Sequence, residues 1–187
     1  MRDSLRALRT CPLAIRLILS NAAISVPSYL TKMFLQQRLI ELGWPTALLF
    51  LPMLLSGAAC VLGTEIARRH KPHSMTRFYA VCALLCGFGT LLVGAAPAWG
   101  GVAGMMLVQG IIEIYNLHES QRLNDVIPSD QRATLISVDS MMYSILMIPA
   151  SPILGWVGDW FGQAGAGLVL LGVLILLSGL IVLKSHS

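Results

Sequence analysis

Long apolar runs follow one another along the whole chain, and they limit its fold more than any other feature of the sequence. An α-helix rises about 1.5 Å per residue, so crossing roughly 30 Å of hydrocarbon takes about 20 residues. The runs approach that length, and short polar clusters separate them. This pattern is typical of a chain whose solvent is lipid, where a spanning segment satisfies its backbone groups internally as a helix.

Six segments are long enough, so the sequence predicts an all-α, polytopic transmembrane bundle of six helices. Residues 1–12 are expected to form a cytoplasmic N-terminal segment, and residues 184–187 a cytoplasmic tail. Turn-forming residues stand between the segments, among them Gly43 with Pro45 and the cluster from Gly158 to Gly162. The six spans predicted within the domain 13–183 are residues 13–34, 46–66, 77–96, 99–118, 133–157 and 164–183.

Composition supports this class and excludes others. The chain is 56% hydrophobic and only 12% charged, about half the charged fraction of an ordinary soluble domain. Its net charge is +4, but the Lys and Arg residues stand between apolar runs and form no basic stripe. Binding of nucleic acid is therefore not expected.

The distribution of basic residues predicts the orientation. With the N-terminus inside, the outer segments hold only Lys32 and Arg38, and Arg16 lies close enough to the inner end of the first helix to snorkel. Basic residues concentrate on the cytoplasmic side of multi-pass proteins, so we expect a multi-pass protein of the plasma (inner) membrane with both termini cytoplasmic. The inner basic residues are Arg2, Arg6, Arg9, Arg68, Arg69, Lys71, Arg77, Arg122, Arg132 and Lys184.

Catalytic and metal-binding patterns are not found in the sequence. A membrane enzyme would need a nucleophile and a base at matching depth, and there is neither a Gly-x-Ser-x-Gly motif nor an intramembrane histidine, since His118 lies at the inner end of the fourth predicted span. The four cysteines and four histidines lack metal-ligand spacing. We therefore expect no enzymatic activity, no metal and no cofactor.

The predicted helices differ in polarity. The first, fourth and fifth carry polar side chains and should face protein or an aqueous cavity, whereas the sixth and the nearly as apolar third can face lipid on most sides. On the fifth, small residues recur at steps of three, four or seven, which favours close packing of another helix over passage of a substrate. These small residues are Ser137, Ser140, Ser144, Ser151 and Gly155.

One segment carries a family resemblance. The run Asn124-Asp125-Val126-Ile127-Pro128-Ser129-Asp130-Gln131-Arg132-Ala133-Thr134-Leu135-Ile136-Ser137 resembles the loop and helix start before the eleventh helix of major facilitator superfamily transporters. Gly155, Gly158, Asp159 and Gly162 are similar to the cluster where that helix ends. The segment from Gly63 to Arg69 resembles the family's Gly-x-x-x-Asp-Arg loop motif, with Glu65 at a shifted position.

The resemblance implies the C-terminal half of such a transporter, built of two inverted three-helix repeats. It implies that the first and fourth helices line a substrate cavity, that the second and fifth contact the other half, and that the third and sixth face lipid. The implied function is transport of a small solute by alternating access, with proton-coupled efflux as one form.

Glu113, within the fourth predicted helix, is the sharpest candidate for proton coupling or for binding a cationic substrate, because a carboxylate in lipid is costly. A structural hydrogen bond to another helix is an equal alternative. Asn116 and Ser120 share its face at i+3 and i+7. Asn21 and Tyr29 of the first helix are further cavity candidates.

Asp139, about two turns into the fifth predicted helix, is a candidate for gating or packing. It has the spacing to pair with Arg132, seven residues back on the same face, although a basic residue in a neighbouring loop is preferred as its partner. Pro128, Ser137, Gly155 and Asp159 complete the gating or packing candidates.

The expected partners are the bilayer, a small-molecule solute, and either the N-terminal half of the transporter or a second copy of the chain. A fragment of a longer protein, a subunit of a split transporter and a homodimer all fit this expectation. The alternatives are a six-helix membrane protein with an assembly or binding role and an inactive truncated transporter.

Overall fold

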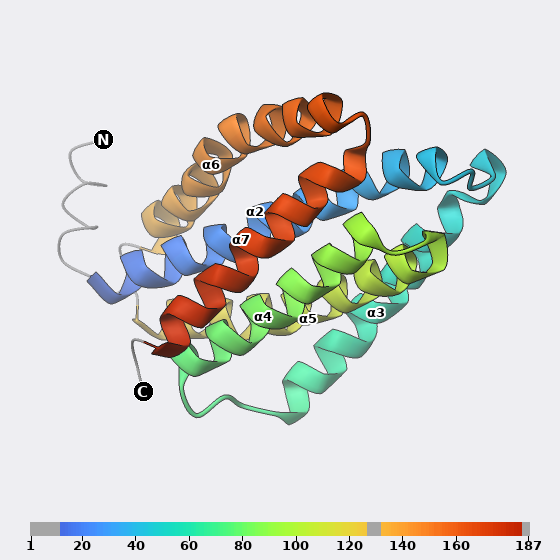
Figure 1. Cartoon of the computed structure of the whole chain (residues 1–187). Helices are drawn as coiled ribbons and strands as arrows, with labels where there is room; N and C mark the ends of the chain where they lie inside the picture. Colours follow the sequence, from blue (N-terminus) through green and yellow to red (C-terminus); the bar gives the residue numbers. More distant parts are fainter. Residues whose placement is uncertain (1–11, 127–131, 185–187) are drawn as a thin grey trace.

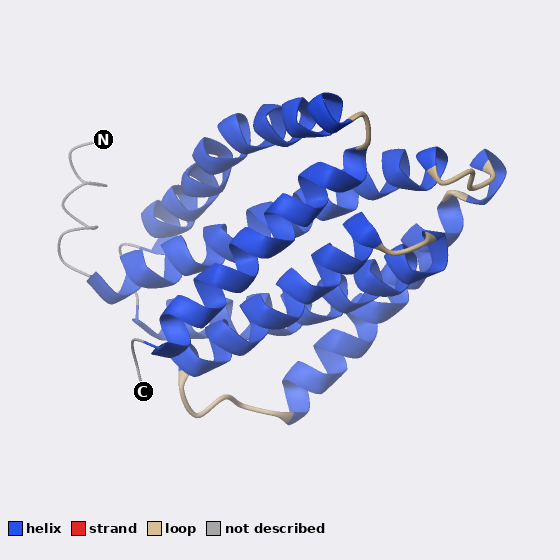
Figure 2. Cartoon of the chain, viewed as in Figure 1, coloured by secondary structure: helices blue, strands red, loops and turns tan. Residues whose placement is uncertain are grey.

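The structure, a computed structural model, consists of six long helices. It describes residues 12–126 and 132–184, without the side chains of residues 12–14 and 132–135. No strand occurs among these residues (Figure 2), so the predicted all-α bundle is confirmed. A short 3₁₀ turn, η1, precedes α3. The elements are α2 (Pro12–Glu41), η1 (Thr46–Leu48), α3 (Phe50–Arg69), α4 (Met75–Ala95), α5 (Ala98–Val126), α6 (Arg132–Phe161) and α7 (Ala164–Lys184).

Five helices in the described part of the chain are long and apolar enough to cross a membrane: α3, α4, α5, α6 and α7. The helix predicted over 13–34 forms as part of α2, but it falls outside this group. Polar side chains such as Arg16, Ser20 and Asn21 lower its apolarity, and the same side chains line cavities described below. The start of α2 and the end of α7 lie at the same end of the bundle (Figure 1).

Two glycines end helices in the way that the turn chemistry predicts. Gly43 and Gly162 have φ angles of 76° and 69°, the left-handed region that only glycine adopts without strain. After each, the next backbone N–H donates to a carbonyl five residues back, Trp44 to Leu39 at 2.9 Å and Gln163 to Gly158 at 2.9 Å. This is the Schellman arrangement, and it satisfies carbonyls that the helix end leaves free.

Glycines also set the most extensive helix contact, which is between α4 and α7. A Cβ on Gly94 would lie 2.7 Å from the carbonyl oxygen of Gly165, and one on Gly87 would lie 3.0 Å from that of Gly172. Both pairs step by seven residues along antiparallel helices, so the two backbones stay close over two turns. Small residues allow this approach, and van der Waals contact then holds the helices together in lipid.

The glycine contacts make α4 an inner helix. Within its apolar span 56% of the residues are buried, against 33% in α7 and 11–39% in the others. The prediction that the third helix faces lipid on most sides is therefore wrong, because α7 covers one side of it and α5 another. The expectation that the sixth helix faces lipid agrees better with the structure, because α7 leaves large apolar side chains such as Leu174 and Ile181 exposed.

At the edge of the bundle, α6 packs against α2 and α7 and follows a curved path (Figure 1) that includes Pro149 and Pro152. Its small residues were predicted to admit a second helix. A Cβ on Gly155 would meet nothing within 4 Å, and Ser140 and Ser144 are exposed. At Gly155, therefore, no helix in the described part of the chain approaches the stripe of small residues.

The beginning of α7 is held by a side chain from α2. The backbone N–H of Ala164 donates to both carboxylate oxygens of Glu41, at 3.0 and 3.1 Å. Arg38 lies 3.5 Å from the same carboxylate. A negative charge here satisfies a free N–H and opposes the positive end of the helix dipole, so Glu41 links the α6–α7 turn to α2.

The glycine contact predicts a strong effect of Gly94→Val. A valine side chain would meet the backbone of α7, and overpacking of this kind costs about 1–3 kcal/mol. Gly57→Val is the control, because a Cβ at Gly57 meets nothing within 4 Å. The free energy of unfolding in mixed micelles, measured by titration with a denaturing detergent, should fall for Gly94→Val alone; equal losses would contradict the contact.

The cap at α7 predicts a second effect on stability. Glu41→Ala should lower the free energy of unfolding by about 1 kcal/mol, because it removes the acceptor for the N-terminal N–H of α7. Glu65→Ala removes only an exposed i,i+4 pair with Arg69 and should cost less than about 0.5 kcal/mol. The same detergent titration measures both, and a Glu41→Ala loss no larger than that of Glu65→Ala would refute the role of Glu41.

Candidate functional site

A polar cavity of about 550 Å³ lies between α2, α5 and α6. It is near the start of α2, the end of α5 and the start of α6, which places it in one half of the bundle (Figure 1). A ligand site of this size is common in proteins. Its lining consists of Asn21, Ser25, Asn116, Glu119, Ser120, Leu123, Asn124, Ile136, Asp139, Ser140, Tyr143 and Ser144.

Helical spacing explains why these side chains share one space. Asn21 and Ser25 are four residues apart on α2, and side chains at that spacing lie on one face. The contributions of α5, from Asn116 to Asn124, recur at steps of one, three or four, as do those of α6 from Ile136 to Ser144. Three polar faces thus converge, and only Leu123 and Ile136 among the lining residues are aliphatic.

Hydrogen bonds connect the three helices across the cavity. The Asn21 amide nitrogen donates to both carboxylate oxygens of Asp139, at 3.2 and 3.3 Å. The Ser25 hydroxyl lies 2.9 Å from the Asn21 amide oxygen and 3.4 Å from that of Asn116. The hydrogen-bonded chain from Asp139 to Asn116 therefore fixes the orientation of a carboxylate by an amide, and no basic side chain among the described residues contacts that carboxylate.

Glu119 is the residue in this site that the sequence did not single out. It is 3% exposed, lines the cavity, and its Oε1 has no hydrogen-bond partner among the described residues. The predicted span ended at residue 118, whereas α5 continues to Val126. The signal that could have found it is its spacing, since Glu119 follows Asn116 by three residues on the same helix.

Of the four predicted substrate or coupling residues, Asn21 and Asn116 line the cavity. Glu113 does not line the cavity. It lies on the α3 side of α5, where its charge acts on the thiol of Cys60. That thiol donates to the Gln109 carbonyl at 3.9 Å. In the described part of the chain Glu113 makes no hydrogen bond or ion pair.

Tyr29, the fourth, lies beside the cavity and does not line it. It is 52% exposed, and its ring meets the ring of Tyr143 edge to face, with centroids 6.3 Å apart. Because Tyr143 lines the cavity, the two rings extend the site toward the middle of the helices.

Of the gating or packing candidates whose side chains are described, only Asp139 lines the cavity. Ser137 lies next to it on α6 and is exposed. Asp159 is exposed at the end of α6, where its carbonyl accepts from Gly162 at 3.2 Å. Arg132 is the first residue of α6, but its side chain, like Pro128 and the segments 1–11 and 185–187, lies outside the described residues.

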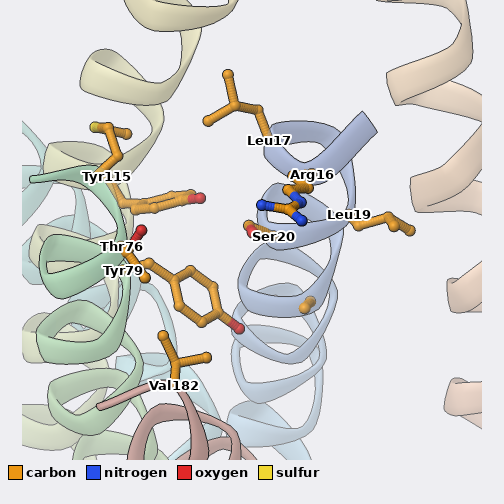
Figure 3. A pocket seen from close by; sticks show the side chains of 10 residues that line it. Arg16, Leu17, Leu19, Ser20, Thr76, Tyr79, Tyr115 and Val182 are labelled. Atoms are coloured by element: carbon orange, nitrogen blue, oxygen red, sulfur yellow. The ribbon is translucent and has the colours of Figure 1, made fainter. Parts of the chain in front are cut away.

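A second cavity, of about 450 Å³, lies on another side of α2 and has the opposite charge character. Figure 3 shows Arg16 and Ser20 on α2 facing Tyr79 and Tyr115 across it. No carboxylate of the described residues lines it. Arg16 and the carboxylates of Glu119 and Asp139 thus line separate cavities.

A scan against family models finds no match for the chain, and the searches of curated proteins and of solved structures find none either. Fold and site by themselves define a class: the described residues are all-helical, five of the helices are long and apolar enough to span a membrane, and an acidic polar cavity lies between α2, α5 and α6. These are the properties of a multi-pass membrane protein.

The cavity predicts a pattern of water access. In a chain whose native cysteines are replaced by alanine, Ser140→Cys should react with a membrane-impermeant maleimide, because Ser140 lines the polar space. Leu177→Cys on α7 is the control, since Leu177 is exposed on an apolar face at a similar distance from its helix end. Labelling yield in membranes is the measurement; no reaction at Ser140→Cys, or equal reaction at both sites, would contradict a water-filled cavity.

Proposed function

We propose that the chain is the C-terminal half of a secondary transporter of the major facilitator type and moves a small solute by alternating access. The observation that carries the proposal is the polar cavity between α2, α5 and α6 in an otherwise apolar bundle. Polar side chains inside a membrane are costly and mark solute or ion pathways. The segment from Asn124 to Ser137, which resembles the family's loop before the eleventh helix, supports the same proposal.

The pattern of exposure supports this arrangement of helices. The resemblance implies that the second and fifth helices contact the other half of the transporter. The corresponding α3 and α6 are the least buried of the five apolar helices, with 22% and 11% of their spans buried. Two exposed helices of this kind fit a partner of the same architecture.

We further propose the identity of that partner and the setting. It is a complementary six-helix half or a second copy of the chain, related by an axis along the membrane normal as transporter halves are. The setting is the plasma (inner) membrane, with both termini cytoplasmic, because ten of the thirteen basic residues belong to segments on that side in the predicted topology.

Proton coupling is part of the proposal, and the cavity moves its candidate from Glu113 to Glu119. A coupling carboxylate must be reachable by the solute or by water in the transport pathway, and Glu119 lines the cavity whereas Glu113 does not. Carboxylates inside membrane helices serve as proton carriers in pumps and transporters.

Proteoliposomes that contain the chain and an internal pH-sensitive dye provide the test. A panel of small solutes is added against an imposed pH gradient, and at least one should cause proton movement. Glu119→Gln should reduce that movement at least about tenfold, as expected for loss of a group that carries the proton. Glu113→Gln should leave it within about twofold.

Two results would contradict the proposal. If no solute of the panel moves, by dye response or by direct uptake, transport by two copies of this chain is refuted. If solute moves but Glu119→Gln responds to pH as the unmodified protein does, the coupling role of Glu119 is refuted.

A further inference from the structure

We infer that the cavity between α2, α5 and α6 binds an organic cation, which assigns a substrate class to the site. This inference rests on the proposed function for its meaning in transport, but the binding itself follows from the lining. Its basis is the juxtaposition of Asp139 with the buried Glu119 in one cavity. The Glu119 Oε1 has no hydrogen-bond partner among the described residues, and none of the described lining residues is basic.

The charges in the cavity are of one sign. Among the described residues, Glu119 and Asp139 are the only carboxylates that line it, and no Lys or Arg does so. Arg16 lines the other cavity, and Arg122, on α5, is exposed and outside the lining. A cleft lined by one sign of charge in a low-dielectric wall concentrates ions of the opposite sign.

Glu119 supplies the observation that points to a ligand. A buried charge is stabilised by pairing or by hydrogen bonds, yet Oε1 has no hydrogen-bond partner among the described residues. A buried charged group that lacks its ion-pair partner is strongly destabilising. A cation in the cavity would provide the missing interaction.

Asp139 is positioned for the same role. Both of its carboxylate oxygens accept from the Asn21 amide, and Asn21 is held in turn by Ser25. A hydrogen bond from an amide orients the carboxylate without neutralising its charge. The carboxylate is therefore held in a fixed orientation within the cavity.

The size and remaining lining favour an organic cation over a small metal ion. The volume of about 550 Å³ is that of a site for a small organic molecule. No group of three His, Cys, Asp or Glu side chains in the described part of the chain is arranged to hold a metal ion. Tyr143 lines the cavity beside Tyr29, and aromatic faces attract organic cations.

The matched ions tetraphenylphosphonium and tetraphenylborate, which share a shape and differ in charge, test the inference. Binding is measured by equilibrium dialysis with the full chain in nanodiscs of neutral lipid, against empty nanodiscs. Tetraphenylphosphonium should bind saturably, and Glu119→Gln with Asp139→Asn should weaken it at least about tenfold, or about 1.4 kcal/mol. Glu113→Gln, a carboxylate change outside the cavity, should leave it within about twofold.

A variant of opposite charge covers the case in which loss of both carboxylates disturbs the fold. Ser120 is an exposed residue of the lining, so Ser120→Arg should be tolerated and should abolish tetraphenylphosphonium binding while admitting tetraphenylborate. Elution as a single species in size-exclusion chromatography confirms that each variant is intact.

The inference is overturned if the unmodified chain binds the borate more tightly than the phosphonium, or if the double variant or Ser120→Arg binds the phosphonium unchanged. The result is separable from the proposed function. Saturable phosphonium binding with no uptake into proteoliposomes would refute transport and leave the cation site standing. Uptake of neutral or anionic solutes without phosphonium binding would do the reverse.

Discussion

The arrangement of this molecule depends on one constraint: in a hydrocarbon environment a polar group must find its partner inside the protein or in a water-filled space. The constraint explains why Asn21, Ser25, Asn116 and Asp139, from three helices, meet in one network. It also explains why α2 is the least apolar of the six helices and yet lies between α5 and α6. Its polar side chains face cavities and leave its remaining faces for packing.

The frame that carries the cavity is held by a different kind of contact. Apolar side chains do not drive helices together in lipid, because lipid is as apolar as they are. Close backbone contact at Gly94 with Gly165 and at Gly87 with Gly172 takes that role between α4 and α7. Next to the contact of Gly94 with Gly165, Glu41 connects α2 to the first N–H of α7. The helices of the cavity are thus attached to a tightly packed pair.

Hydropathy and turn residues were sufficient to predict the number, order and approximate bounds of the helices, because both are local properties of the sequence. The same local information identified Asn21, Asn116 and Asp139 as polar residues that must face other protein groups or an aqueous cavity. It could not identify Glu119, because a length rule ended the span one residue too early. The same information predicted that Glu113 and Asn116 share a face of α5. The small rotation about the helix axis between these two residues is enough to turn Glu113 toward Cys60. The glycine pairs were missed since each needs a partner 71 to 85 residues away, which no local pattern supplies.

Cross-linking between α2 and α6 in native membranes tests the central claim most directly, which is that polar side chains 118 residues apart meet in one cavity. In a chain with its native cysteines replaced, Asn21→Cys with Asp139→Cys should form a disulfide rapidly under mild oxidation and give a shifted band on non-reducing gels. Asn21→Cys with Glu113→Cys should not. Failure of the first pair to cross-link, or equal cross-linking of both pairs, would contradict the convergence of α2, α5 and α6 on which the site and its proposed ligand depend.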